Sequence, residues 1–115
     1  MYQLVLLIPT SVNLEKFDET WPSFLKVAEQ MPGLIKESVS RVDQLIYGSE
    51  FISRIYTFTF PDQESLEKAL VSNPGERAGQ LIHDLTDGKV ILLTARYQED
   101  FQNHIQSFTP LENDL

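Results

Sequence analysis

The sequence contains no cysteine, which excludes disulfides, iron–sulfur clusters, thiolate metal sites and a cysteine nucleophile. Basic residues are few, with 9 Lys and Arg against 17 Asp and Glu, and the formal net charge is −8. Binding to nucleic acid or to an anionic membrane surface needs clustered cations, so this balance argues against both. No apolar run approaches the roughly 20 residues that cross a bilayer. The start, Met1-Tyr2-Gln3, lacks the basic region of a signal peptide, and we expect a cytoplasmic protein.

The sequence also lacks the short motifs of several enzyme classes. It has no G-x-G-x-x-G, no P-loop and no G-x-S-x-G, so it offers neither a dinucleotide or phosphate cradle nor a serine hydrolase nucleophile. The two histidines, His83 and His104, are far apart in the chain and do not have the spacing of metal ligands. We therefore expect neither a metal nor a cofactor.

What the sequence does contain is a clear order of strands and helices. Its 115 residues, 42% of them hydrophobic, suit a single domain with one core. Apolar patterning predicts strands at 2–8, 34–47, 51–60 and 90–97, and helices at 14–31 and 62–85, the second interrupted at 73–75. Pro22 inside the first helix predicts a kink or a break near Thr20. The segment 34–47 mixes apolar and charged residues, which is typical of an exposed edge strand.

This order predicts an α+β, ferredoxin-like βαββαβ fold. Right-handed crossovers place the first and third strands in the centre of a four-stranded antiparallel sheet, with both helices on one face. We expect this domain to span residues 1–97. In the tail, residues 98–115, Phe101, Ile105 and Phe108 have helical spacing, which predicts a short docked helix.

The second face of such a sheet has no cover of its own. Val5 or Leu7, together with Ile55, fall on this face. Exposing a few hundred Å² of apolar surface costs several kcal/mol at roughly 25 cal/mol per Å². A second copy of the chain is the simplest cover, so we expect a homodimer formed through the sheet face, a dimeric α/β barrel.

Three charged or titratable residues are candidates for catalysis. His83 could act as a general base beside Asp84, or it could be a half-exposed histidine at a helix end, bonded to Asp84. Arg54 could belong to an anion-binding or acid–base group inside the barrel, or it could form an ion pair at an edge or between subunits.

The strand at 51–60 has one face of small and polar side chains that could line a cavity: Ser53, Ile55, Thr57 and Thr59. On its other face, Tyr56 is expected to pack in the core. Trp21 is interpreted as an anchor between helix and sheet, and Glu37 as a solvated edge residue.

Several segments, in this order, resemble EthD-like proteins of the dimeric α/β barrel superfamily. They are Phe17 with Trp21, Met31-Pro32-Gly33-Leu34, Tyr56-Thr57-Phe58-Thr59-Phe60 followed by 63–70, then 72–76 and 83–90. The resemblance implies the ferredoxin-like fold and an oxidoreductase label. Relatives in the superfamily are cofactor-free monooxygenases, polyketide cyclases and muconolactone isomerases. Many EthD-like sequences have a histidine shortly after the helical tryptophan, whereas residues 22–26 here contain none.

Two functions follow from these observations. The first is a cofactor-independent enzyme of oxygenase, isomerase or cyclase type, acting on a small hydrophobic organic molecule between sheet and helices. The second is a non-catalytic dimeric binding or structural module of the same fold. A deep pocket with two or more converging titratable groups would favour the enzyme, and a space filled by Val, Ile and Leu would favour the module.

Overall fold

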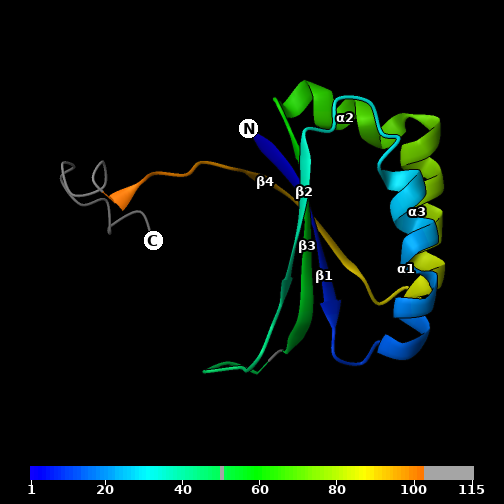
Figure 1. The fold of residues 1–115 in the computed structure, drawn as a ribbon, viewed down its shortest axis with the longest axis vertical. Coiled ribbons are helices and arrows are strands. Elements are labelled where there is room, and N and C mark those ends of the chain that lie inside the picture. The colour runs from blue at the N-terminus through cyan, green and yellow to red at the C-terminus, as the bar shows by residue number, and fades with distance from the viewer. Residues whose placement is uncertain (50, 103–115) are drawn as a thin grey trace.

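Four antiparallel strands form one open sheet, and the helices lie on one side of it (Figure 1). The computed structural model describes residues 1–49 and 51–102. The elements are β1 (Tyr2–Pro9), α1 (Leu14–Ala28), β2 (Lys36–Arg41), β3 (Ile52–Phe60), α2 (Gln63–Val71), α3 (Asn73–Leu85) and β4 (Ile91–Arg96). The ferredoxin-like fold class is therefore confirmed. The sheet of a single chain is not closed into a barrel.

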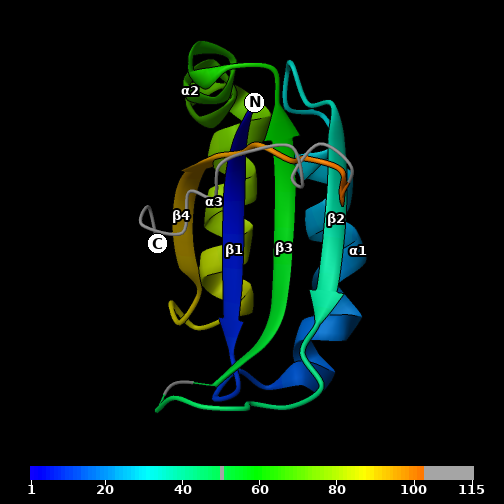
Figure 2. The ribbon, with the colours of Figure 1, turned by 90° about the vertical axis from the view of Figure 1, so that its left-hand side faces the viewer.

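The strand order is β2-β3-β1-β4, with the first and third strands in the centre as expected (Figure 2). In the register, Leu6 of β1 lies between Tyr56 of β3 and Leu92 of β4. One residue further along, Leu7 lies between Ile55 and Ile91. Successive side chains of a strand point to opposite faces, so these two rows lie on opposite sides of the sheet.

Helix α1 is continuous through Pro22, so of the two expectations near Thr20, a kink or a break, the break is wrong. Proline has no backbone N–H, so at position 22 it removes the helical hydrogen bond to the Asp18 carbonyl oxygen, four residues earlier. Buried Phe17 and Phe24, on either side of the proline, hold both halves of the helix in the core. Packing thus outweighs the cost of one lost hydrogen bond.

The expected interruption at 73–75 is confirmed, because α2 ends at Val71 and α3 begins at Asn73. Ser72 caps α3, where its hydroxyl accepts a hydrogen bond from the Gly75 N–H at 3.2 Å. Gly75 permits a close approach of the two helices, since a Cβ at this position would lie 2.0 Å from the Ala69 carbonyl oxygen.

The second strand is shorter than predicted from segment 34–47. Pairing of β2 with β3 ends where Arg41 lies opposite Arg54, and like charges directly opposite each other weaken a sheet. Residues 42–49 instead form part of the β2–β3 connection, on which Ile46 and Tyr47 are exposed. In Figure 1 this connection projects to the side of the sheet that faces away from the helices.

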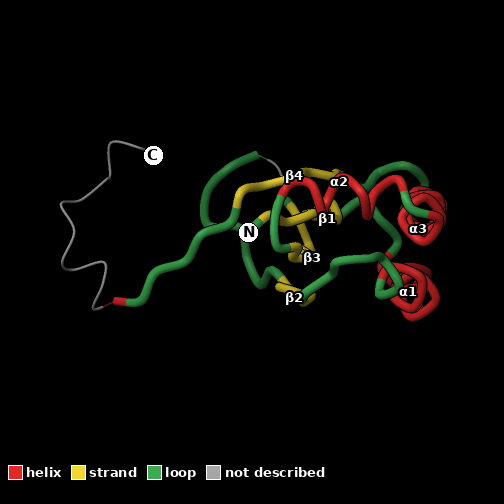
Figure 3. The backbone as a smooth tube through the Cα atoms, turned by 90° about the horizontal axis from the view of Figure 1, so that it is seen from above, coloured by secondary structure: helices red, strands yellow, loops and turns green. Residues whose placement is uncertain are grey.

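The core lies between the sheet and the helices. Its largest fully buried apolar side chains are Leu6, Ile8, Phe17, Phe58, Phe60, Leu66 and Ile82. The opposite side of the sheet, here called the open face, has no helix over it (Figure 3). Residues 97–102 leave the sheet on that side, and Phe101 is exposed there. The docked helix predicted for the tail depends on residues 103–115, which lie outside the described residues. No helix in the part of the chain that the structure describes has the length and apolar character needed to cross a membrane.

Candidate functional site

A cavity of about 170 Å³ lies between α1 and the edge of the sheet formed by β2 and β3. Its lining residues are Trp21, Leu25, Glu37, Ser38, Val39, Tyr56 and Phe58. We call it the α1–β2 cavity. In Figure 2, α1 passes behind β2 and β3, which places this space on the helix side of the sheet. The cavity is therefore separate from the open face.

Stacked aromatic rings form one wall of the α1–β2 cavity. The ring centroids of Trp21 and Tyr56, which both line the cavity, are 4.0 Å apart. Trp21 packs against the core, as expected of an anchor between helix and sheet, but it is only partly buried. Its exposed part faces the cavity. Such a wall suits an apolar or aromatic group of a ligand.

One carboxyl group, that of Glu37 from β2, lines this cavity, and the Glu29 carboxyl of α1 influences its pKa. Glu37 lies opposite Phe58 in the strand register and so points to the helix side of the sheet. Glu29 is the C-cap of α1, four residues after Leu25, which places it next along the helix stripe that lines the cavity. Partial burial, a hydrogen bond from the Glu29 carboxyl and repulsion by it raise the pKa of Glu37 to about 7.

A carboxyl with this pKa exchanges its proton near neutral pH. A carboxyl group with a raised pKa beside an apolar wall can both donate and accept a proton. Glu37 was expected to be a solvated edge residue. It is indeed exposed, but it also lines the cavity.

Arg54, one of the predicted site residues, lies behind the aromatic wall rather than in the cavity. Its guanidinium binds both carboxylate oxygens of Asp18 on α1, and its side chain is only 14% exposed. The same guanidinium lies over the Phe17 ring, 5.7 Å from its centroid, and hydrogen-bonds the Tyr56 side chain. The bond to Arg54 lowers the pKa of Asp18. Arg54 is thus placed to orient Tyr56.

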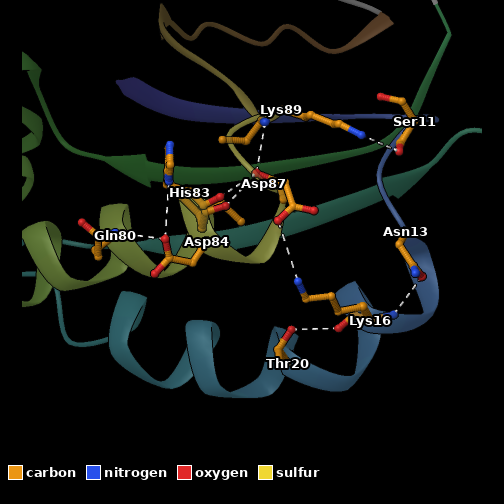
Figure 4. Close-up of polar contacts among 12 residues, drawn as sticks. Ser11, Asn13, Lys16, Thr20, Gln80, His83, Asp84, Asp87 and Lys89 are labelled. Carbon is orange, nitrogen blue, oxygen red and sulfur yellow. Dashed lines mark hydrogen bonds and ion pairs between the residues drawn. The ribbon is translucent and has the colours of Figure 1, made fainter.

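His83 and Asp84 lie at the C-terminal end of α3 (Figure 4). His83 Nδ1 is 3.4 Å from Asp84 Oδ1, and the His83 side chain is 67% exposed. Asp84 also accepts a hydrogen bond from Gln80 Nε2 at 3.0 Å. No hydrogen bond or ion pair among residues 1–49 and 51–102 joins this pair to Arg54. The structure does not bring the three predicted residues together.

Of the predicted cavity-lining residues of β3, Ile55, Thr57 and Thr59 lie on the open face, while Ser53 is the unpaired residue of a bulge, where its hydroxyl donates to the Ile8 carbonyl oxygen at 2.9 Å. Thr57 hydrogen-bonds Ser38 of β2. Thr59 is buried, and its hydroxyl accepts a hydrogen bond from Gln3 Nε2 at 3.2 Å. These residues line the side of the sheet that a second copy would cover, not the α1–β2 cavity.

Sequence reasoning missed the pairing of Glu37 with Glu29. One signal was available, because period-two alternation in segment 34–47 places Glu37 on the same side as Val39. An acidic residue on the apolar side of an edge strand indicates either a functional group or a fold-specific partner.

Comparison with solved structures supports the predicted resemblance at the level of the fold. An ethyl tert-butyl ether d (EthD) family protein from Bacillus halodurans C-125 matches with a TM-score of 0.76 and 20% identity, over 85% of this chain and 99% of that one. A dimeric ferredoxin-like protein of unknown function from Jannaschia sp. CCS1 matches with a TM-score of 0.60 and 20% identity, over 84% and 97% of the two chains.

A third match is SnoaB, a cofactor-independent oxygenase from Streptomyces nogalater. Its TM-score is 0.65 at 10% identity, over 88% of this chain and 96% of SnoaB. Neither a family model nor a curated protein matches the sequence. Other ferredoxin-like matches are also described as dimeric. The shared property of these proteins and this chain is the fold.

Proposed function

We propose that this protein binds a small hydrophobic organic molecule in the α1–β2 cavity and transfers a proton to or from it without a cofactor. The observation that carries the proposal is the Glu37 carboxyl, which lines the cavity together with Trp21 and Tyr56 and whose pKa is raised to about 7. Removal of a proton from an activated C–H or O–H group is a step that oxygenase, isomerase and cyclase chemistry can share. The cavity therefore supports any of these reaction types.

Two further observations favour the enzyme over a non-catalytic module of the same fold. Between α1 and the β2–β3 edge a cavity remains beside the core, and titratable side chains of two strands line it: Glu37 of β2 and Tyr56 of β3. The fold is also that of SnoaB, described as a cofactor-independent oxygenase. In this proposal Arg54 orients Tyr56, while His83 and Asp84 stay outside the reaction.

The proposal includes a homodimer formed through the open faces, and it keeps the cytoplasmic location expected from the sequence. Leu7, Ile55 and Ile91 form an apolar row across the three strands of this face. Solved proteins of this fold are described as dimeric. Because the α1–β2 cavity lies on the other side of the sheet, dimer formation leaves it accessible.

The sole tryptophan of the chain lines the cavity, so its fluorescence reports occupancy directly. We would titrate the protein with acetophenone, a one-ring ketone with an acidic C–H, and follow Trp21 emission. Val39→Phe narrows the cavity and should abolish the saturable change. Val71→Phe adds the same ring on the exposed side of α2 and should leave the saturable fluorescence change intact.

Proton transfer is measured separately, as deuterium exchange into the acetophenone methyl group in D₂O by NMR. We expect Glu37→Gln to bind the ketone but to lower the catalysed exchange by about a hundredfold. Binding without any catalysed exchange in the unsubstituted protein would favour the non-catalytic module. No saturable binding would contradict the proposed site.

A further inference from the structure

The β2–β3 connection, residues 42–49, carries the two most exposed large apolar side chains among the residues that the structure describes. Tyr47 is 95% exposed and Ile46 is 88% exposed, and the neighbouring Leu45 is 41% exposed. The connection bends around a hollow of about 670 Å³, which is lined by Leu45, Ile46, Tyr47, Gly48 and Ser49. No helix or strand contributes to that lining. We call residues 45–47 the apolar arm.

Both ends of the connection are hydrogen-bonded to neighbouring segments. The Val42 N–H donates to the Ser53 carbonyl oxygen at 3.0 Å, and the Phe51 carbonyl oxygen accepts a hydrogen bond from the Thr10 N–H at 3.3 Å. Gly48 has a φ of 133°, which residues with a Cβ rarely adopt, and it bends the chain next to the apolar arm. In Figures 1 and 3 the connection projects on the side of the open face, away from α1 and α3. A molecule seated on the open face would therefore lie beside the apolar arm.

The open face itself carries almost no charge. It consists of Gln3, Val5 and Leu7 of β1 and the residues in the same three rows of the other strands. Of these residues only Lys36 is charged and none is acidic, although the chain has 17 acidic residues and a net charge of −8. Copies of so acidic a chain repel each other unless they meet through surfaces without acidic groups. The open face is such a surface, and it is suited to a second copy of itself in a two-fold dimer.

The sheet alone is small for a stable interface. Its four strands lie about 4.8 Å apart, and the six residues of β4 rise about 3.3 Å each, which gives a plan area of roughly 400 Å². Stable interfaces bury about 800 Å² of accessible surface on each partner. A stable dimer therefore needs contacts beyond the sheet, and the apolar arm offers uncovered apolar surface on the side where the second copy would lie.

We propose that the apolar arm is part of the dimer interface, and that the arm of each copy packs against the other copy and buries Ile46 and Tyr47. This inference rests on the dimer in the proposed function and adds the residues that stabilise this dimer beyond the sheet. Two-fold symmetry doubles the contact, because each copy contributes one arm and receives one. Tyrosine is among the residues that contribute most to binding at interfaces, since its ring buries a large apolar area.

The test measures dimer dissociation by sedimentation velocity on the full chain. We expect the double variant Ile46→Ser with Tyr47→Ser to raise the dimer dissociation constant at least about tenfold. The variant should fold like the unsubstituted protein, because both side chains are already exposed in the single chain. Val71→Ser, which removes an equally uncovered apolar side chain from α2, should leave the dissociation constant unchanged.

A second measurement uses the absence of cysteine, since Ile46→Cys can be labelled at one position with the environment-sensitive dye acrylodan. As the protein concentration rises, the emission should shift to shorter wavelength with the midpoint that sedimentation gives. The same dye on Val71→Cys should not shift.

A dimer that is unaffected by the double variant, or in which the dye at position 46 stays in water, would overturn the inference and leave the proposed dimer intact. An unsubstituted protein that remains monomeric up to about 100 μM would overturn both, and would assign the apolar arm to a different partner. Occupancy of the α1–β2 cavity is measured independently by the Trp21 titration, so failure of the proposed binding function stays distinguishable.

Discussion

The two faces of β3 show how one strand can serve two different environments. On the helix side, Tyr56, Phe58 and Phe60 are 5%, 1% and 0% exposed. On the open face, Ile55 and Thr57 remain partly exposed. The helix side is thus a finished core within one chain, and the open face is half of an interface.

This difference indicates that one set of residues in the sheet stabilises the folded chain, and that a separate set would stabilise its association with a second copy. The buried side chains of the helix side, such as Phe58 and Phe60, are removed from water when the chain folds, at about 25 cal/mol per Å² of apolar surface. Leu93 of β4, on the open face, is 46% exposed in the single chain. Its remaining apolar surface contributes only when a second copy covers it.

The largest effect is expected from Phe58→Ala. Phe58 lies between the α1–β2 cavity and a smaller apolar cavity on the β4 side, so the space left by the ring has little chance to collapse. We expect the free energy of unfolding to fall by about 3–5 kcal/mol in urea denaturation. Ile55→Ala, on the open face, should cost about 1 kcal/mol when measured on monomers. Similar losses for both variants would contradict the division between the two faces.

Leu93→Glu tests the open face and should weaken the proposed dimer. A carboxylate on the open face would be buried without a partner in the dimer, and we expect the dimer dissociation constant to rise about a hundredfold, roughly 3 kcal/mol. The unfolding free energy of the monomer should change by less than about 1 kcal/mol. Sedimentation velocity measures the association, with Val71→Glu on α2 as the control. A monomer without any substitution would disprove the proposed dimer.

A third prediction concerns the helical cover of the finished face. Gly75→Ala places a methyl group 2.0 Å from the Ala69 carbonyl oxygen, so α2 and α3 must separate. We expect a loss of about 2–3 kcal/mol by chemical denaturation. Gly79→Ala, one turn later in α3, meets no atom within 4 Å and should gain about 0.5–1 kcal/mol from helix propensity. Equal effects would show that the junction is not tightly packed.

Local patterns were sufficient to predict the fold. Alternation in segment 51–60 correctly placed Tyr56 on the helix side. Strand order followed from crossover handedness. These features depend on neighbours in the sequence or on general rules of connection.

The candidate site could not be predicted in the same way. It depends on how the C-terminal end of α1 is placed relative to β2. This placement brings Glu29 close enough to Glu37 to raise its pKa. The ion pair between Arg54 and Asp18 could not be predicted either, because nothing in the sequence indicates that these two distant residues are in contact. By contrast, the predicted pair of His83 and Asp84 was adjacent in sequence, and adjacency alone indicated a contact but not a site.

The smallest predicted effect concerns pH and Glu37. Its pKa in the folded chain, about 7, lies above the ordinary value of 4.5. Between these two pH values the folded chain therefore holds more protons than the unfolded chain, and stability must fall as pH rises through this window. In Glu37→Gln the group no longer titrates and no longer repels Glu29, so this part of the slope should disappear.

The size of the pH effect is limited by solvent, because Glu37 is exposed. We expect Glu37→Gln to be more stable than the unsubstituted protein by about 1 kcal/mol at pH 8, and the two to be similar near pH 5. Urea denaturation at the two pH values measures the difference, and Glu67→Gln controls for the change in net charge. In the unsubstituted protein at pH 8, the ionised Glu37 carboxylate would then be a charge without a cationic partner beside the buried core. A Glu37→Gln variant with the same pH slope as the unsubstituted protein would show that the carboxyl pair does not form in solution.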